Sequence, residues 1–583
     1  RSWPEFRDLW EAALSDARGG VYGMIGRPKE AESEYRTCVA SIRSYLAKNR
    51  PGNDLFYYYL PQCLSRAMEH AALVGKVREA GAYINDAREA ARIHAQRQQR
   101  DNFEAARVTR PIARVYLEQG LIREGTSLLE TSIAQLQKAP GGEAGIQVAD
   151  MRYLLALSQM AQANWPQADA IFKAWRDGLR SNQQQSAQTG TISAEWGYVM
   201  LRLGRVQEAQ AMTRPILKFR ENYDDEQSVR LWEGRAFHAL GLGAAGQGDT
   251  AVKTLATAIP KILELRRDKN NWGEDGYLSS ARLGWFFDGY IALLAEMHQK
   301  GARLEGLEPA AEAFRMADAA RGSKVQKALS AAIIRTNGND PESAVVMRRA
   351  QDLEHAAKTV SESLTILQTM ADSPEKARSL AKAQADLVRL RQENEQAQAE
   401  LRLKMPNYVE LMEPKMLTIA DAQKLLRPDE ALISLYTTSD KTLVWAMTAK
   451  GQPAFHVADL AHQSIAETVA RLRKSLDPSA VDIDQLPDFD FDSAHDLYRK
   501  LLAPAEPGWK GARELIIVSH RALRELPLSV LLTTSFTPVK TSQSAVPFAQ
   551  HAEAPWLLKQ AAISYLPSVS ALLSVRTTPA QPA

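Results

Sequence analysis

Hydrophobic residues in the first half of the chain recur at helical spacing on both sides of six similar hexamers. Each hexamer has a small first residue, a polar middle and a final Ala or Gly, and the six begin at Gly26, Gly75, Gly120, Ala163, Gly204 and Gly246. A glycine between two helical stretches ends one helix, and the closing alanine belongs to the next. Each hexamer therefore predicts a helix-turn-helix unit, repeated about every 45 residues.

A second regularity lies seven positions before most hexamers, where a small residue would let two helices approach closely. Five units have Gly or Ala there, namely Gly19, Ala113, Ala156, Gly197 and Ala239, and Met68 is the exception. The pattern resembles the tetratricopeptide repeat (TPR), with helices longer than in its minimal form. We expect a helical solenoid over residues 1–335, capped by a degenerate last unit from Trp285 to Ala328.

The first helices of such an array line an extended concave surface. Five residues are candidates for binding a protein partner there: Arg107, Arg110 and Arg114 of the third unit, with Tyr153 and Tyr198 of later units. An acidic segment of the partner would suit the three arginines. The alternative is that they form a solvated face, and Pro111 between them can kink or start the helix.

After the repeats, the stretch from Pro341 to Leu403 is rich in Ala, Gln, Glu, Lys and Arg and is interrupted at Asp372–Pro374. Apolar residues on each side alternate steps of three and four, the spacing of a coiled-coil seam. They are Val346, Ala350, Leu353, Ala357, Val360, Leu364 and Leu367, then Leu380, Ala383, Leu387, Leu390, Ala397 and Leu401. We predict an antiparallel helical hairpin over residues 341–404. Asn394 falls on the second seam, where a buried amide favours one register, or else at a frayed edge.

From Met405 onward the pattern changes to short runs rich in β-branched and aromatic residues. Strands are predicted at 431–438, 441–449, 454–458, 514–519 and 561–566, the first two joined by a turn at Ser439 and Asp440. Helical stretches near 462–476 and 493–502 lie between them. Strands that alternate with helices predict an α/β layer.

Three blocks of this last third resemble the opening of a CHAT domain, the caspase-like domain that follows TPR arms. The blocks are MPNYVELMEPKMLTIADAQKLLRPDEALISLYTTSDKTLVWAMT, LYRKLLAPAEPGWKGARELIIVSHRALRELPLSVLL and WLLKQAAISYLPSVSALLSVR. Their order after a repeat array and a helical connector matches the family's architecture. One departure is SHRAL at 519–523, where the family tends to have a Pro-Asp-Gly-like turn.

The resemblance implies a cysteine protease in which a Cys attacks the peptide carbonyl and a His assists proton transfer. In the family both motifs lie well after the YLPSVSALL block, and this chain ends soon after it. Cys38 and Cys63 lie in the first repeats, so neither is carried over as the nucleophile. His520 ends a predicted strand, but without a cysteine in this half it is interpreted as a turn residue and not as a catalytic base.

Composition narrows the remaining possibilities. A net charge of +3 is too small for a general nucleic-acid binder, and no apolar run approaches the roughly 20 residues of a membrane helix. The histidines show no ligand spacing, and GLGAAG at 241–246 matches a dinucleotide fingerprint without the strand that should precede it. We expect no metal and no cofactor.

The two cysteines leave two readings open. Cys38 and Cys63 lie on consecutive helices about equally far from the turn at Arg50–Gly52, so antiparallel packing can place them at one level. If the protein is exported they can form a disulfide, provided their Cα atoms lie within roughly 7 Å. In a cytoplasmic protein both would be small buried packing residues. The sequence does not fix the compartment.

The expected architecture is a TPR solenoid (1–335), a helical hairpin connector (341–404) and an incomplete α/β caspase-like CHAT domain (405–583). The expected function is recognition and regulation within a TPR-CHAT cysteine protease whose catalytic half lies outside this chain. Its partners would be a protein or peptide on the TPR face and its own C-terminal CHAT fragment. The alternative is a non-catalytic TPR scaffold with a CHAT-like remnant.

Overall fold

The computed structural model describes residues 6–48, 54–98, 103–138, 145–180, 192–267, 276–302, 304–321, 341–369, 373–404, 416–476, 488–538 and 549–577. Two compact units are present. The first comprises Arg1–Phe286 with Gln351–Gln396, and the second comprises Phe287–Ala350 with Ala397–Ala583. The division falls inside α15 (Tyr277–Gln299) and differs from the three predicted ranges.

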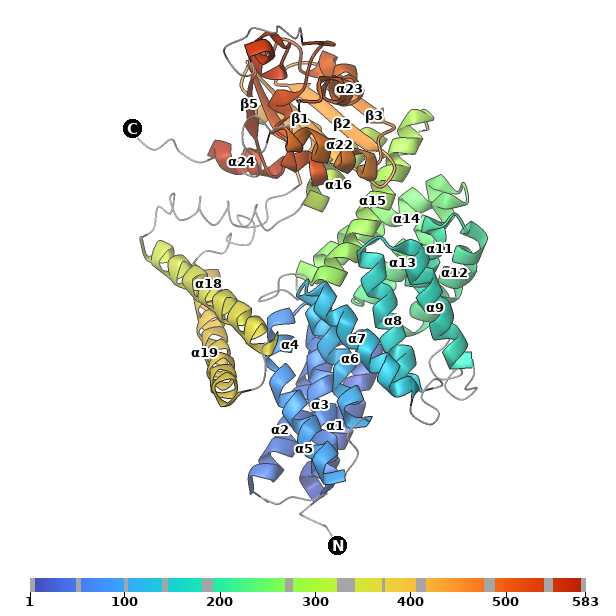
Figure 1. Ribbon diagram of the computed structural model, residues 1–583, viewed down its shortest axis with the longest axis vertical. Helices are drawn as coiled ribbons and strands as arrows, with labels where there is room; N and C mark the ends of the chain where they lie inside the picture. The colour runs from blue at the N-terminus through green and yellow to red at the C-terminus, as the bar shows by residue number, and fades with distance from the viewer. Residues whose placement is uncertain are drawn as a thin grey trace. The chain divides into compact units, whose positions relative to one another are not determined.

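The first unit contains the repeat arm, a series of helical hairpins that follow one another along the chain (Figure 1). Their helices are α1 (Arg7–Met24) and α2 (Pro28–Lys48), α3 (Asp54–Leu73) with α4 (Val77–Ala82) and α5 (Ile84–Gln98), α6 (Phe103–Glu118) and α7 (Ile122–Gln137), α8 (Ile146–Ala161) and α9 (Trp165–Arg180), α11 (Ala194–Arg202) and α12 (Val206–Tyr223), α13 (Val229–Ala244) and α14 (Gly248–Arg267). The predicted helix-turn-helix repeat is confirmed.

Each of the six hexamers begins at a residue with positive φ, between 59° at Ala163 and 84° at Gly75 and Gly246. The next amide then bonds back five residues to a carbonyl of the preceding helix, as from Lys76 N to Ala71 O over 2.8 Å. This is the left-handed helix cap that glycine favours. Ala163 adopts it without being glycine.

Two of the predicted small residues lie where helices press together. A Cβ atom on Gly19 would lie 2.6 Å from the Tyr35 ring, and one on Gly197 would lie 2.7 Å from the methyl group of Thr213. Both contacts join the two helices of one hairpin. The prediction of close helix approach is therefore confirmed at these positions, whereas Met68 is fully buried in the core of the first repeats.

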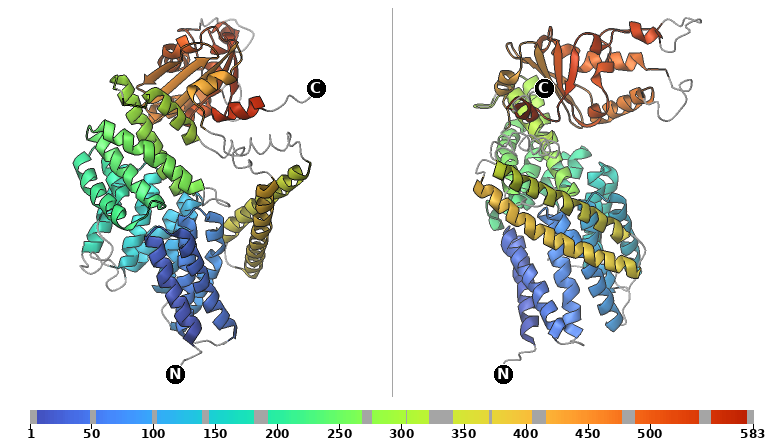
Figure 2. Two further views of the ribbon diagram at one scale, coloured as in Figure 1. Left: turned by 180° about the vertical axis from the view of Figure 1, so that it is seen from behind. Right: turned by 90° about the vertical axis from the view of Figure 1, so that its left-hand side faces the viewer.

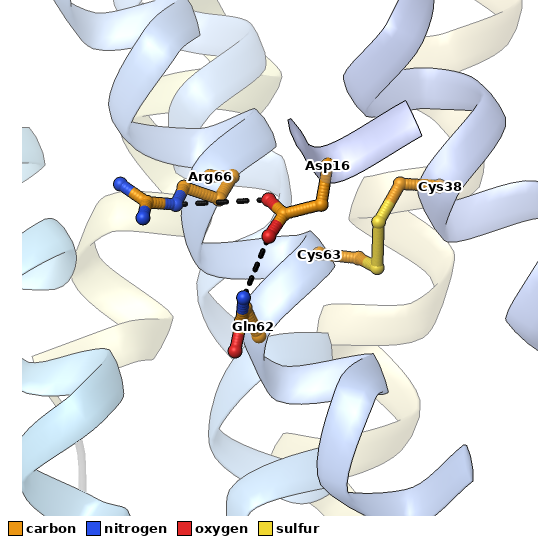
Figure 3. The surroundings of a disulfide bond; sticks show 5 residues. All are labelled: Asp16, Cys38, Gln62, Cys63 and Arg66. Carbon is orange, nitrogen blue, oxygen red and sulfur yellow. Dashed lines mark hydrogen bonds and ion pairs between the residues drawn. A yellow bond between two sulfur atoms is a disulfide. The ribbon is translucent and has the colours of Figure 1, made fainter. Parts of the chain in front are cut away.

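Cys38 on α2 and Cys63 on α3 form a disulfide bond, with Cα atoms 5.6 Å apart and both side chains buried (Figure 3). The Cα–Cα distance thus lies within the limit of roughly 7 Å that a disulfide requires. Beside the bond, Asp16 of α1 accepts a 2.6 Å hydrogen bond from Gln62 and lies 3.7 Å from Arg66. The first three helices are therefore linked both covalently and by polar contacts.

The predicted hairpin is formed by α18 (Pro341–Thr369) and α19 (Pro374–Lys404), which lie side by side in both views of Figure 2. Ala357, Leu387 and Leu390 form its buried core together with Ala82 of α4, whose carbonyl accepts a 2.9 Å hydrogen bond from Gln384. Asn394 is only 3% exposed. The amide therefore lies within the seam, and the frayed-edge alternative is wrong.

The second unit is built on a five-stranded sheet in the order β3-β2-β1-β4-β5. Its strands are β1 (Glu430–Thr437), β2 (Thr442–Thr448), β3 (Ala454–Ala458), β4 (Glu514–Val518) and β5 (Ala562–Tyr565). The β1, β4 and β5 strands are parallel to one another, and β2 and β3 are antiparallel to their neighbours. All five predicted strands and the predicted turn at Ser439 and Asp440 are present. Strands with buried apolar residues on both faces need helices on both sides.

One face of the sheet packs on α22 (His462–Lys474) and α23 (Phe491–Leu501) through Ile433, Leu435 and Val444. On β2, Trp445 alternates to the other side, where its Nε1–H donates to the carbonyl of Ala310 over 2.9 Å. The helix α16 (Pro309–Arg321) therefore covers the sheet, with Phe314 against Trp445. The expected capping unit, Trp285 to Ala328, is therefore wrong for α16, whose apolar residues pack on the β-sheet, whereas Trp285 and Phe286 at its start pack on the arm. Residues 322–328 lie outside the described residues.

The remaining described elements of the second unit are short. They are α21 (Ile419–Leu425), α24 (Ser570–Thr577) and the 3-10 turns η5 (Ala503–Gly508), η6 (Arg521–Glu525), η7 (Leu528–Val530), η8 (Ala549–Glu553) and η9 (Leu557–Lys559). The outer strands β3 and β5 are less buried than β1 and β4. Because β1 and β4 are parallel neighbours, they end at the same edge of the sheet, and the turns that follow them lie next to each other.

Candidate protein-interaction surface

The three candidate arginines lie on α6 and face α3. Arg107 donates to the hydroxyl of Tyr58 at 2.5 Å, and its guanidinium lies 4.3 Å from the centre of that ring. Arg110 forms a 2.6 Å ion pair with Glu69. Pro111 is accommodated inside α6, so it neither starts nor ends this helix. The three arginines therefore lie in one row along the α3–α6 contact.

Their exposure and charge differ along this row. Arg114 is 8% exposed and lies 3.6 Å from Glu118 and 3.9 Å from Glu69. Burial alone would lower the pKa of the Arg110 guanidinium, but Glu69 and Asp150 outweigh that effect and raise it. Burial also raises the pKa of the Asp150 carboxyl. The arginines are therefore not a freely solvated face, and Arg107 and Arg110 are the two that remain partly accessible.

The two candidate tyrosines are anchored further along the arm. Tyr153 on α8 donates a 2.7 Å hydrogen bond to Glu195 and lies edge-on to Phe172 and Trp175. Burial, followed by the charge of Glu195, raises the pKa of the Tyr153 hydroxyl above its ordinary value. Tyr198 on α11 is 7% exposed and stacks on Trp285, with ring centres 5.3 Å apart.

The partner of Tyr198 belongs to the first turns of α15, and these turns are held by the first helices of several repeats. At the start of α15, Glu118 of α6 accepts hydrogen bonds from the amides of Leu278 (3.1 Å) and Ser279 (3.4 Å). A carboxylate at this position satisfies amides that a helix N-terminus leaves without partners. There is no room for a side chain at Gly276, because a Cβ atom there would overlap the carboxylate of Glu118.

Arg282, one turn further along α15, is the centre of a buried charge network. Its guanidinium lies 3.0 Å from Glu233 of α13 and 3.3 Å from Glu195 of α11. Glu233 also receives Arg266 at 3.0 Å. Burial would lower the pKa of Arg282, but the two carboxylates outweigh burial and raise it. Arg282 therefore stays charged at neutral pH, and its charge is among the causes that lower the pKa of the Glu195 carboxyl despite burial.

The structure thus brings Arg114, Tyr153 and Tyr198 to one surface, where each touches α15 or a residue that binds α15. Sequence reasoning missed the binding residues Glu118, Glu195, Glu233, Arg282 and Trp285. The available signal is Arg282 itself, a cation that directly precedes the apolar stretch LGWFFDGYIALLAEM in the same helix. A buried cation in such a segment requires carboxylates on the surface that receives it.

The structure also places His520 and the GLGAAG segment, two features that the sequence analysis set aside. His520 follows β4 and stacks on Tyr436 with ring centres 4.1 Å apart, which agrees with its interpretation as a turn residue. The GLGAAG segment lies at the end of α13 and in the following turn, as expected for helix packing. Within the described ranges no helix is long and apolar enough to cross a membrane, and no cluster of His, Cys, Asp or Glu is arranged to hold a metal.

Comparison with known proteins gives three similar structures. BtubC (BKLC) from P. vanneervenii is 18% identical over 42% of this chain and 94% of that chain, with a TM-score of 0.29. A variant of a protein described as a kinesin light chain with nearly identical TPR-like repeats, from Podosopora anserina, is 18% identical over 35% and 96%, with a TM-score of 0.25. The apo form of RapI is 9% identical over 66% and 99%, with a TM-score of 0.32. No family model and no curated protein matches the chain. The description of the arm as a TPR-type repeat rests on its own helices and turns.

Proposed function

We propose that the chain is a protein-interaction module whose repeat arm binds a protein partner through Arg107 and Arg110, the two arginines of the predicted set that remain partly accessible. The other predicted residues, Arg114, Tyr153 and Tyr198, would act in this surface by holding α15. The observation that carries this proposal is the binding of α15 by the first helices of the arm. These helices hold a helical segment by a carboxylate at its N-terminus, by ion pairs to Arg282 and by stacking on Trp285. Repeat arms use such extended surfaces to bind polypeptides.

Arg107 and Arg110 on α6 fit an acidic segment of a protein partner. Arg110 is 26% exposed as a side chain, and its present partner Glu69 comes from the arm itself. An acidic side chain of a partner would take the place of Glu69 or share the guanidinium with it. The near-neutral net charge of +3 offers no broad field for nucleic acid, so the recognition is local.

A direct test uses a fluorescent eight-residue polyglutamate peptide and the full chain. Binding measured by anisotropy should weaken about tenfold or more in an Arg107→Gln, Arg110→Gln variant, because charge-assisted hydrogen bonds are lost. The matched control is Arg92→Gln on α5, which removes an exposed arginine paired with neighbouring Glu89. Equal binding by both variants, or no binding by the unmodified chain, would contradict an acidic partner on α6.

The finer proposal is that this module is the recognition and regulatory part of a TPR-CHAT caspase-like cysteine protease. It is supported by the resemblance of the three blocks and by the parallel β1, β4 and β5 strands on which they lie. Both cysteines of the sequence are joined to each other, so a catalytic thiol would come from outside this chain. The isolated chain is therefore expected not to cleave peptides by a cysteine mechanism.

A non-catalytic scaffold is the second candidate, and the disulfide that uses both cysteines favours it. Sequencing the reading frame downstream of Ala583 separates the two. A histidine motif followed by a cysteine motif supports the protease, and an early stop codon supports the scaffold.

The proposed docking of a C-terminal fragment has its own test. Residues 405–583 expressed alone should unfold without a sharp transition unless the downstream segment is added, because the outer strand β5 offers unpaired backbone groups. A soluble monomer with one sharp transition would instead favour a self-contained domain.

A further inference from the structure

Three arginines gather where the parallel strands β1 and β4 end, within the second unit. Arg521 and Arg524 belong to the turn after β4, and Arg321 is the last residue of α16. The guanidinium of Arg321 lies 5.7 Å from the Tyr436 ring, which stacks on His520. Arg524 donates to the carbonyl of Ser519 over 3.1 Å. We call Arg321, Arg521 and Arg524 the strand-end arginine cluster.

The nearby carboxylates do not balance these three charges. Asp288 accepts hydrogen bonds from Arg521 at 2.6 Å and from the hydroxyl of Tyr436 at 3.0 Å. Asp318 accepts from the amides of Val569 (2.6 Å) and Ser570 (3.1 Å) at the start of α24. Neither Arg321 nor Arg524 forms an ion pair with a carboxylate in the described part of the chain. Two carboxylates therefore lie near three arginines, and Arg321 is attracted by Asp318 without forming an ion pair with it.

Arg321, which is more buried than Arg524, also has N–H donors without acceptors. Arg321 is 7% exposed and uses one Nη to donate to the carbonyl of Leu435 over 2.6 Å. Its Nε and its other Nη have no partner among the described residues, and neither does the buried hydroxyl of Ser519. A buried donor left without a partner is destabilising, and native proteins rarely keep one without a bound water, ion or ligand.

The charge state of Arg321 fits this environment. Burial lowers the pKa of its guanidinium to about 10, and repulsion from Arg524 acts in the same direction against the attraction of Asp318. At neutral pH the group is still protonated, so an uncompensated cation is present in a buried place. An anion that approaches from the side of the exposed Arg524 would supply the counter-charge and accept from the free N–H groups.

We propose that the strand-end arginine cluster is a binding site for a small oxyanion, a phosphate or a carboxylate, held by Arg321 and Arg524 with the Ser519 hydroxyl as a further donor. Ligands of open α/β sheets commonly bind outside the carboxyl ends of parallel strands, which is where these groups lie. The site belongs to the second unit and is independent of the partner-binding role proposed for the arm.

The test titrates the full chain in a chloride buffer with sodium phosphate in one arm and sodium acetate in the other, at constant ionic strength. A specific site gives a rise in melting temperature that grows logarithmically with anion concentration above the dissociation constant. The anion that gives the rise identifies the ligand class. Isothermal titration calorimetry measures the affinity directly.

Variants decide whether the cluster is responsible. Arg321→Met should abolish the saturable effect, and Arg524→Gln, a change at an exposed position, should weaken binding about tenfold. Arg499→Gln on α23 is the control, because this arginine is exposed and paired with Asp496 in the same unit. The proposal is overturned if neither anion gives saturable binding, or if Arg524→Gln binds as tightly as the control.

Discussion

The two units treat a buried arginine in opposite ways. In the arm, Arg282 lies between Glu195 and Glu233, and the helix that carries it is capped by Glu118. In the second unit, Arg321 is more deeply buried, at 7% exposed against 20% for the Arg282 side chain, and it has a carbonyl as its acceptor and two donors left over. Arg282 also leaves its Nε without a hydrogen-bond partner in the described part of the chain, so the contrast lies in the carboxylates, which pair with Arg282 and not with Arg321. A buried charge paired with carboxylates is expected to maintain structure, whereas one without an ion-pair partner is expected to bind a counter-ion. The comparison therefore separates the arm surface, which already binds α15, from the strand-end arginine cluster, for which we propose a bound anion.

The disulfide gives the largest expected effect, and it tests whether the arm behaves as one unit. Cys38 and Cys63 are 25 residues apart, so reduction should lower stability by about 3.5 kcal/mol through the entropy of the unfolded chain. Hydrogen exchange with and without reductant should show the loss in α2 and α3. If α15 loses protection equally, the arm is a single cooperative unit and the paired charges around Arg282 are not a separate source of stability.

Gly276 tests the cap of α15. Gly276→Ala should cost about 1–3 kcal/mol, because a Cβ atom would displace the Glu118 carboxylate from the amides of Leu278 and Ser279. The control is Gly284→Ala in the same helix, where a Cβ atom meets nothing within 4 Å. Urea unfolding curves of both variants make the measurement. Equal stability of the two would show that the Glu118 cap does not hold α15.

His520 gives the second unit a pH dependence. Burial, and then the charges of Arg321, Arg521 and Arg524, lower the pKa of its imidazole well below the ordinary value. Below a pH of about 6.5, the His520 imidazole takes up a proton in the unfolded chain but not in the folded unit. The free energy of unfolding therefore falls as the pH is lowered from 7 toward 5. His520→Phe should reduce the slope of stability between pH 7 and 5. His462 and His551, whose pKa values are also lowered, leave a smaller slope. An unchanged slope would show that the arginines do not act on His520.

Ala163 gives the smallest effect and serves as a calibration of the arm. Its φ of 59° is the conformation that glycine adopts in the other five turns, so Ala163→Gly should stabilise the arm by about 0.5–1 kcal/mol. The reverse change, Gly204→Ala at a φ of 76°, should destabilise it by about 1–2 kcal/mol. A loss of stability in Ala163→Gly would mean that the turn is not strained.

Periodicity predicted the local structure of both units because it depends on neighbouring residues. The six turns and the five strands follow directly from glycine spacing and from apolar runs. The place of α16 could not be predicted in this way, because its apolar residues suit a helix or a sheet as partner, and only the alternating Trp445 of β2 decides between them.

The candidate surface was predicted in part for a similar reason. The register placed Arg114, Tyr153 and Tyr198 on one surface, but it could not reveal that α15 supplies their neighbours. Glu118 and Leu278, for example, are 160 residues apart in the sequence. Pairing between distant charges depends on the packing of several repeats. The role of Arg107, Arg110, Arg114, Tyr153 and Tyr198 in binding a partner stays a prediction.

The most direct test of the contrast between the two arginines compares Arg282→Met with Arg321→Met in the full chain, in a chloride buffer free of phosphate and carboxylate. Local stability is read by hydrogen exchange in α15 and in β4. Arg282→Met should cost about 3–5 kcal/mol in α15, because it removes the cation paired with Glu195 and leaves Glu233 with Arg266 alone. Arg321→Met should cost less than about 1 kcal/mol in β4, or stabilise it, because it removes an uncompensated buried charge. A loss in β4 as large as the loss in α15 would contradict the account, since Arg321 would then be a structural residue and not one that awaits an anion.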